Sequence, residues 1–190
     1  MRIGIYPGSF DPIHLGHIKI INEILNSKIV DKVLVVPTGN YWSKNVVASI
    51  KDRINMIKLF SSDTILVEEK DNTITATYDF LKLKEIEYSG DEFWLILGAD
   101  NLENIHKWIN YTKLIEYPFI VIKRDNFDGT YINRRFSEMN KSNYIILDIP
   151  NIDISSTYIR ENIDRYEKLD KIIDNRVYQY IQNNNLYREY

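Results

Sequence analysis

Short apolar runs alternate along the chain with segments in which apolar residues recur at helical spacing. The runs predict six short strands: Ile3 to Tyr6, Val33 to Val36, Ile65 to Val67, Phe93 to Leu97, Phe119 to Ile122 and Tyr144 to Leu147. The most hydrophobic run, Phe93 to Leu97, is continuous rather than alternating. A continuous run is typical of a strand that is covered on both faces.

Helical patterns separate most of these runs. The first, Gly16 to Ser27, places four residues on one face: Ile20, Ile21, Ile24 and Leu25. A second helix starts at about Ser49, where Ser49 and Asp52 resemble a capping box, and its apolar face consists of Ile50, Ile54 and Ile57. A third covers Thr75 to Glu87, with apolar positions at Tyr78, Leu81 and Ile86. Strands that alternate with helices predict an α/β fold, a Rossmann-like doubly wound parallel sheet with right-handed crossovers.

The pattern changes after Pro150. Two helices are expected there, Ser155 to Asn162 and Asp170 to about Asn183, the second with an inward face formed by Ile173, Val177, Tyr180 and Ile181. At 190 residues the chain has the length of one domain. We therefore expect a single domain over residues 1–190, with a Rossmann-like core at 1–150 and a helical segment at 151–190.

Composition narrows the function. Lys plus Arg is 24 and Asp plus Glu is 27, so the net charge is −3, which disfavours a nucleic acid as partner. The absence of cysteine excludes disulfides, thiolate catalysis and cysteine-bound metals. The apolar runs are too short for a secretion signal or a membrane span, so we expect a cytoplasmic protein with no membrane partner. Whether the protein forms a homo-oligomer stays open.

The loop after the first strand carries the clearest chemistry: Gly8-Ser9-Phe10-Asp11-Pro12-Ile13-His14-Leu15-Gly16-His17. In open parallel sheets, ligands bind beyond the carboxyl ends of the strands. His14 and His17 lie three positions apart at the start of a helix, where backbone N–H groups favour phosphate. Gly8 and Gly16 have no Cβ, so no side chain at these positions would keep an anion away from the backbone. The alternatives are two surface residues that merely lie close together, or an i, i+3 metal pair, for which only Asp11 and the distant His106 offer further ligands.

A second motif begins the first helix after Pro150: Ile154-Ser155-Ser156-Thr157-Tyr158-Ile159-Arg160. Ser155 is a good N-cap. Ser156, Thr157 and Arg160 offer hydroxyls and a guanidinium that can hold the β- and γ-phosphates of ATP. An ordinary capped helix with a surface arginine explains the same residues when they are taken alone.

Together the two motifs resemble the nucleotidyltransferase superfamily, which has a His-x-Gly-His tetrapeptide after its first strand and a serine-rich helix start near its C-terminus. Two further stretches, Gly98-Ala99-Asp100-Asn101-Leu102 and Lys107-Trp108, are similar to the bacterial nicotinate-nucleotide adenylyltransferases. The resemblance implies transfer of the adenylyl group of ATP to nicotinate mononucleotide, giving deamido-NAD and pyrophosphate in NAD biosynthesis. It implies Mg²⁺ as the cofactor, held mainly by phosphates and water without metal ligands from the protein.

The resemblance also implies roles for particular residues. The catalytic set is His14, His17, Lys44 and Arg160. The ATP-binding set is Gly8, Ser9, Phe10, Gly16, Gly98, Asp100, Ile154, Ser155, Ser156 and Thr157. The mononucleotide-binding set is Thr73, Thr75, Asn101, Trp108 and Arg124. From the residues alone, Asp100 can equally be a helix cap and Trp108 a core aromatic.

Some positions depart from the family pattern. Tyr41-Trp42-Ser43-Lys44 stands where the family usually has Pro-Pro-His-Lys, and Ile74 and Ile109 replace aromatic residues. Two sister activities therefore stay open, on nicotinamide mononucleotide and on phosphopantetheine, although the phosphopantetheine enzymes usually have threonine in place of the first histidine. A nucleotide-binding regulatory module without turnover is the alternative from another class.

Overall fold

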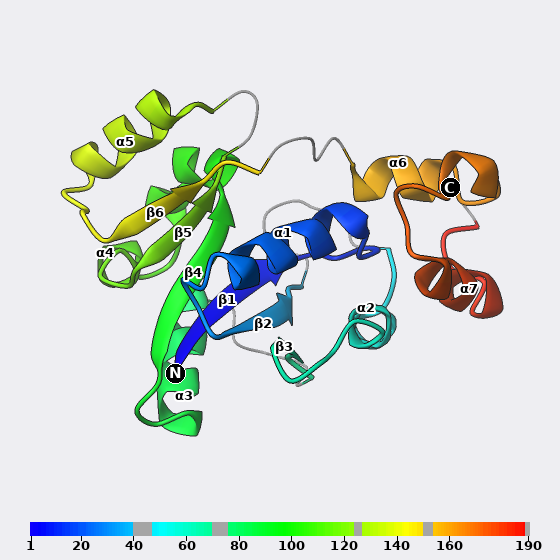
Figure 1. The fold of residues 1–190 in the computed structure, drawn as a ribbon, viewed down its shortest axis with the longest axis horizontal. Helices are drawn as coiled ribbons and strands as arrows, with labels where there is room; N and C mark the ends of the chain where they lie inside the picture. Colours follow the sequence, from blue (N-terminus) through cyan, green and yellow to red (C-terminus); the bar gives the residue numbers. More distant parts are fainter. Residues whose placement is uncertain (40–46, 70–75, 124–126, 150–153, 189–190) are drawn as a thin grey trace.

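The computed structural model describes residues 1–39, 47–69, 76–123, 127–149 and 154–188. Within them, six strands form one sheet in which every neighbouring pair is parallel: β1 (Arg2–Gly8), β2 (Lys32–Pro37), β3 (Ile65–Val67), β4 (Glu92–Gly98), β5 (Phe119–Ile122) and β6 (Tyr144–Leu147). Their order across the sheet is β3-β2-β1-β4-β5-β6 (Figure 1). The strand order reverses between β1 and β4, as in doubly wound sheets, so the predicted fold class is confirmed.

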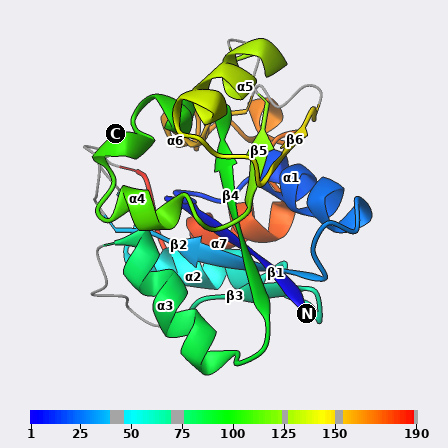
Figure 2. The ribbon, with the colours of Figure 1, turned by 90° about the vertical axis from the view of Figure 1, so that its left-hand side faces the viewer.

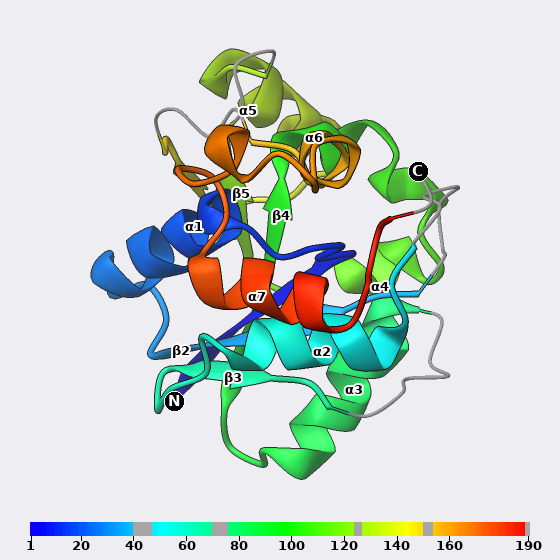
Figure 3. The same ribbon diagram turned by 90° about the vertical axis from the view of Figure 1, so that its right-hand side faces the viewer.

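The reversal divides the helices between two faces. One face packs against α1 (Leu15–Asn26), α2 (Ile50–Lys58), α6 (Ser156–Glu161) and α7 (Asn175–Asn183) (Figure 3). The other packs against α3 (Thr77–Glu87), α4 (Tyr111–Leu114), α5 (Gly129–Glu138) and two 3₁₀ turns, η1 (Ala99–Glu103) and η2 (Ile105–Lys107) (Figure 2). A third 3₁₀ turn, η3 (Tyr166–Lys168), lies between α6 and α7.

Successive strand residues serve opposite faces. Leu95 joins the cluster under α3, α4 and α5, whereas Ile96 joins the cluster under α1, α2 and α7, and both side chains are fully buried. A strand that must be apolar on both sides reads as a continuous run. This explains why β4 is the most hydrophobic stretch of the sequence.

The structure corrects two of the expected helices and adds a helix that was not expected. α7 begins at Asn175 rather than Asp170, because the Asp174 carboxylate accepts a hydrogen bond from the Arg176 N–H and caps the helix there. In α3, Ile86 is 77% exposed, and the buried positions are Phe80, Leu81 and Lys84. α5 was not expected, because Ile132 and Phe136 are its only buried apolar side chains.

Lys84 on α3 is buried among carboxylates. Its ammonium group pairs with Glu68, which follows β3 and is also buried, and donates a hydrogen bond of 2.6 Å to Glu87. Burial opposes the charged form, but the bonds to Glu68 and Glu87 raise the pKa of Lys84. The ion pair therefore holds α3 against the segment that leaves the edge strand β3.

None of the helices among the described residues is long and apolar enough to cross a membrane.

We predict that Lys84→Met lowers the free energy of unfolding by about 3–5 kcal/mol, because the buried Glu68 carboxylate then lacks its cation. Lys82→Met is the matched control, since Lys82 lies on the same helix and pairs with Glu85 at the exposed surface. Urea unfolding followed by tryptophan fluorescence measures both variants. If Lys84→Met costs no more stability than Lys82→Met, the buried pair is not what holds α3.

Candidate active site

The switch point of the sheet brings two loops together. The register that sets Ile5 of β1 beside Leu95 of β4 brings the last residues of these strands, Gly8 and Gly98, to the same edge. The loop after β1 carries His14 and His17, for which a catalytic role is predicted, and the turn after β4 carries Asp100. This is the edge at which open α/β sheets bind ligands.

His14 and His17 form a stacked pair at the start of α1. Their ring centroids lie 3.7 Å apart with planes inclined by 23°. His14 is the N-cap of α1 and is 4% exposed, whereas His17 is only half-buried. The His14 backbone N–H donates to Nδ1 of His17 at 3.3 Å, so a neutral His17 carries its proton on Nε2. The more accessible ring of the pair therefore has its donor on the nitrogen farther from the backbone.

Phe10 packs against the histidine pair. Its ring lies edge-on to His17 at 4.9 Å and to Tyr6 at 5.4 Å, and it is 2% exposed. A Cβ on Gly8 would come within 2.9 Å of Cζ of Phe10. Gly8 thus makes room for the Phe10 ring, and its expected role beside an anion stays a prediction.

The carboxyl-terminal segment docks on this loop. Ser156 of α6 donates its hydroxyl to the Pro12 carbonyl at 3.0 Å, and Arg160 donates to the Asp11 carbonyl at 2.7 Å and to the Thr157 hydroxyl at 3.2 Å. Ser155 caps α6 by accepting from the Tyr158 N–H. The Leu15 N–H, in the first turn of α1, donates to the Ile172 carbonyl, so this helix-end donor is used within the protein.

Two buried charged side chains at this edge, Asp11 and Arg53, are not in the predicted site sets, and the sequence suggested Asp11 only as a further ligand in the alternative of a metal pair. Asp11 is 2% exposed and accepts from the N–H groups of Val47 and Ala48 and from the Tyr187 hydroxyl. Arg53 of α2 is 3% exposed, and its Nη1 donates to the carbonyls of Ser9 and Thr38, each at 2.7 Å. Burial lowers the pKa of the Arg53 guanidinium. The sequence did contain a signal, because Arg53 shares the apolar face of Ile50, Ile54 and Ile57.

The β4 side of the site is more open. Asp100 is exposed in the first turn of η1, whose N-cap is Gly98. Asn101 donates from Nδ2 to the Gly98 carbonyl at 3.4 Å. Trp108 follows η2 and is half-buried against the cluster under α3, α4 and α5. Ile109, next to it, is 56% exposed, and His106 is exposed on η2.

Four of the predicted site residues lie outside the described residues: Lys44, Thr73, Thr75 and Arg124. The departures from the family pattern at 41–44 and at Ile74 also fall there. Among the residues that the structure does describe, no group of three or more His, Asp or Glu side chains could hold a metal ion.

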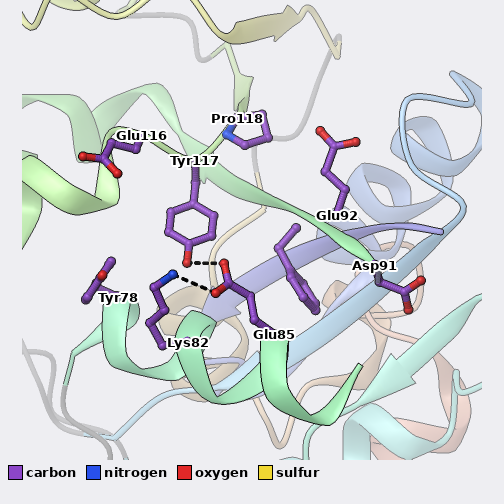
Figure 4. Close-up of a pocket in the computed structure, with 9 residues that line it drawn as sticks. Tyr78, Lys82, Glu85, Asp91, Glu92, Glu116, Tyr117 and Pro118 are labelled. Atoms are coloured by element: carbon purple, nitrogen blue, oxygen red, sulfur yellow. Dashed lines mark hydrogen bonds and ion pairs between the residues drawn. The ribbon is translucent and has the colours of Figure 1, made fainter. Parts of the chain in front are cut away.

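A hollow of about 410 Å³ lies at the opposite edge of the sheet, beside Glu92 at the start of β4 and Pro118 before β5 (Figure 4). Its polar centre is an internal network in which Lys82 and the Tyr117 hydroxyl both donate to Glu85 (Figure 4). Burial and the bond to Glu85 raise the pKa of Tyr117 to about 12. An acidic lining at the amino ends of the strands disfavours phosphates, so this hollow is not the candidate site.

We predict that Gly8→Ala destabilises the protein by about 1–3 kcal/mol and lowers its activity, because the new Cβ displaces the Phe10 ring toward His17. Gly129→Ala is the control, since a Cβ there meets nothing within 4 Å. Thermal unfolding of both variants and of Gly8→Ala/Phe10→Leu makes the comparison. A Gly8→Ala variant as stable as wild type, or no recovery in the double variant, would contradict this packing.

Comparison with known proteins agrees with this geometry. The model of the cytidylyltransferase-like family matches residues 5–162. A probable nicotinate-nucleotide adenylyltransferase of Fusobacterium nucleatum is 35% identical, over 96% of this chain and 97% of its own. Another from Caldicellulosiruptor saccharolyticus is 33% identical over the whole of both chains.

A solved structure extends the likeness to the fold. The Plasmodium falciparum nicotinic acid mononucleotide adenylyltransferase, complexed with NaAD, has a TM-score of 0.82 and 28% identity, covering 98% of this chain and 97% of its own. The sheet order, the histidine pair at the switch point and these matches lead to one conclusion. The chain belongs to the cytidylyltransferase-like family and, within it, to the nicotinate-nucleotide adenylyltransferases.

Proposed function

We propose that this protein transfers the adenylyl group of ATP to nicotinate mononucleotide, releasing pyrophosphate and forming deamido-NAD. The observation that carries the proposal is the stacked histidine pair at the switch point, with the carboxyl-terminal segment packed beside it. The relatives of matching length bear the name of this activity. The solved relative complexed with NaAD, the dinucleotide that this reaction would form, supports the same substrate.

The proposed reaction is an in-line displacement. A 5′-phosphate oxygen of the mononucleotide attacks the α-phosphorus of ATP, a new P–O bond forms, and the bond to the β-phosphate breaks to release pyrophosphate. The nucleophile is already ionised, so the protein supplies orientation and electrostatic stabilisation. We propose that the Nε2–H of His17 donates a hydrogen bond to an α-phosphate oxygen and that His14 supports the His17 ring. Lys44 and Arg160 would bind the polyphosphate of ATP.

We assign ATP and the mononucleotide to the two sides of the switch point. The loop after β1, together with Gly98, Asp100 and the start of α6, would bind ATP, so that residues 151–190 complete the ATP site of a single domain. Asn101 and Trp108 after β4 would bind the mononucleotide, with Trp108 offering a flat face to the pyridine ring. From the resemblance, Thr73, Thr75 and Arg124 would add to this side.

We propose that a divalent cation such as Mg²⁺, bound to the phosphates of ATP, would neutralise charge on the leaving pyrophosphate. The carboxylate in the loop that carries the histidines does not favour a metal held by the protein. Asp11 is buried and already accepts three hydrogen bonds, so it is committed to the protein itself. We therefore propose that phosphates and water hold most of the coordination shell.

The test is to incubate the purified protein with ATP, Mg²⁺ and nicotinate mononucleotide, and to measure pyrophosphate and the mass of the dinucleotide. Parallel reactions contain nicotinamide mononucleotide or phosphopantetheine. We expect the highest kcat/KM with nicotinate mononucleotide. A higher kcat/KM with either alternative would change the substrate, and no pyrophosphate with any of the three would indicate a module without turnover.

We predict that His17→Ala lowers kcat by roughly 100- to 1000-fold, the cost of losing one preorganised donor to a transition-state oxygen. Some stability is lost as well, because the His17 ring packs on His14 and Phe10. His17→Gln, which keeps an N–H donor, should retain more activity than His17→Ala at similar stability. If His17→Ala turns over at nearly the wild-type rate, His17 takes no part in the chemistry.

We predict that Trp108→Ala raises the KM for the mononucleotide roughly tenfold and the KM for ATP much less. The reason is that the variant loses the proposed stacking of Trp108 on the pyridine ring, which only the mononucleotide has. Trp108→Phe keeps a flat face and should lie between. Initial rates at varied concentrations of each substrate give both constants. Equal increases in the two constants would make Trp108 a structural residue.

A further inference from the structure

A buried hydrogen-bond junction joins the last turn of the chain to the loop that carries the histidines. The Tyr187 hydroxyl donates to Oδ1 of Asp11 at 2.7 Å, across 176 residues of sequence. The Ala48 N–H donates to the same oxygen at 3.1 Å, and the Val47 N–H donates to Oδ2 at 2.7 Å. Asp11 and Tyr187 are 2% and 4% exposed. One carboxylate therefore ties together three segments that are distant in the sequence.

The backbone on both sides of the junction is strained. Tyr187 has φ +66° and Phe10, which precedes Asp11, has φ +47°. Bulky side chains rarely adopt the left-handed region, and they stay there only where surrounding contacts hold them. Tyr187 lies just past α7, where the Leu186 N–H donates to the Ile181 carbonyl and turns the chain back toward the site. The hydroxyl is thus delivered to Asp11 by a defined turn.

In this junction the Asp11 carboxylate is the acceptor and the Tyr187 hydroxyl is a donor. Burial, and then the nearby Asp11 carboxylate, raise the pKa of the Tyr187 hydroxyl above its ordinary value, so the hydroxyl is protonated at neutral pH and can donate. Nη1 of Arg160 lies 4.0 Å from Oδ2 of Asp11 and donates to its backbone carbonyl. Without the Tyr187 hydroxyl, the Ala48 N–H would be the one donor to Oδ1 among the residues that the structure describes, at 3.1 Å.

We infer that Tyr187 is a positioning residue for the proposed reaction. Its hydroxyl acts through Asp11 and holds the loop that presents His14 and His17 at a fixed place relative to Val47 and Ala48, which lead into α2. His14 is three residues beyond Asp11, so a movement of Asp11 is passed along a short stretch of backbone to the reacting groups. A displacement of about 1 Å at catalytic groups can cost roughly 100-fold in rate. The inference rests on the proposed function for its kinetic consequence only.

A matched control lies in the same segment. Tyr180 of α7 also donates its hydroxyl to a carboxylate, Oδ1 of Asp52 at 2.9 Å, and accepts from Asn55 at 2.9 Å. Both partners are on α2. Tyr180→Phe and Tyr187→Phe therefore each remove one hydroxyl–carboxylate bond and keep the ring, but only Tyr187 contacts Asp11.

The first experiment compares the two variants. We expect Tyr187→Phe to lower kcat about tenfold or more while the KM for the mononucleotide changes less than threefold, and Tyr180→Phe to keep kcat within about twofold. Amide hydrogen exchange by mass spectrometry should speed up in the peptides that cover 9–17 and 47–49 in Tyr187→Phe only. Equal kcat values, or equal exchange in these peptides, would overturn the inference.

A double-mutant cycle tests whether Tyr187 acts through Asp11. Asp11→Ala/Tyr187→Phe should turn over no more slowly than Asp11→Ala alone, because no side-chain oxygen at residue 11 is then left to accept from the hydroxyl. Fully additive losses in kcat would contradict the route through Asp11. If the wild-type protein releases no pyrophosphate, the proposed function fails, and the hydrogen-exchange comparison still decides whether Tyr187 holds the loop.

Discussion

The packing of the carboxyl-terminal segment onto the first crossover loop is the interaction on which the candidate site depends. A loop without regular structure cannot pair its own backbone polar groups, so other segments must supply the partners. Here Ser156 and Arg160 donate to the carbonyls of Pro12 and Asp11, and the Ile172 carbonyl accepts from the Leu15 N–H. Residues near the other end of the chain therefore help to hold the loop that carries the histidines in a defined shape.

Inside that frame, the histidine pair is held by packing. Phe10 occupies the space beside the bare Cα of Gly8 and meets the edge of the His17 ring. Arg53 donates hydrogen bonds to the carbonyls of Ser9, after β1, and Thr38, after β2, and so links these two loops. These contacts order the site before any substrate arrives, which is the condition under which a hydrogen-bond donor stabilises a transition state most effectively.

Much of the fold could be predicted from the sequence, because the signals are local. The continuous run at Phe93 to Leu97 indicated a strand with two covered faces, and β4 has them. Ser155 was identified as a helix cap, and its hydroxyl does accept from the Tyr158 N–H. In contrast, α5 has too few buried apolar side chains to show a helical period, and Ile86 is exposed although its type indicated a buried position. The link from Tyr187 to Asp11 leaves no local trace, since it spans nearly the whole chain.

The proposed reaction requires that the His17 ring faces the phosphates of ATP. The chain has only three histidines, and the exposed His106 offers an internal reference. The most direct measurement is NMR of ¹⁵N-labelled imidazoles during titration with a non-hydrolysable ATP analogue and Mg²⁺. We expect a His17 ring protonated on Nε2 whose signals shift on binding, while those of the exposed His106 stay in place. Unchanged His17 signals in a protein that binds the analogue, or equal shifts at His17 and His106, would show that the His17 ring does not face the phosphates.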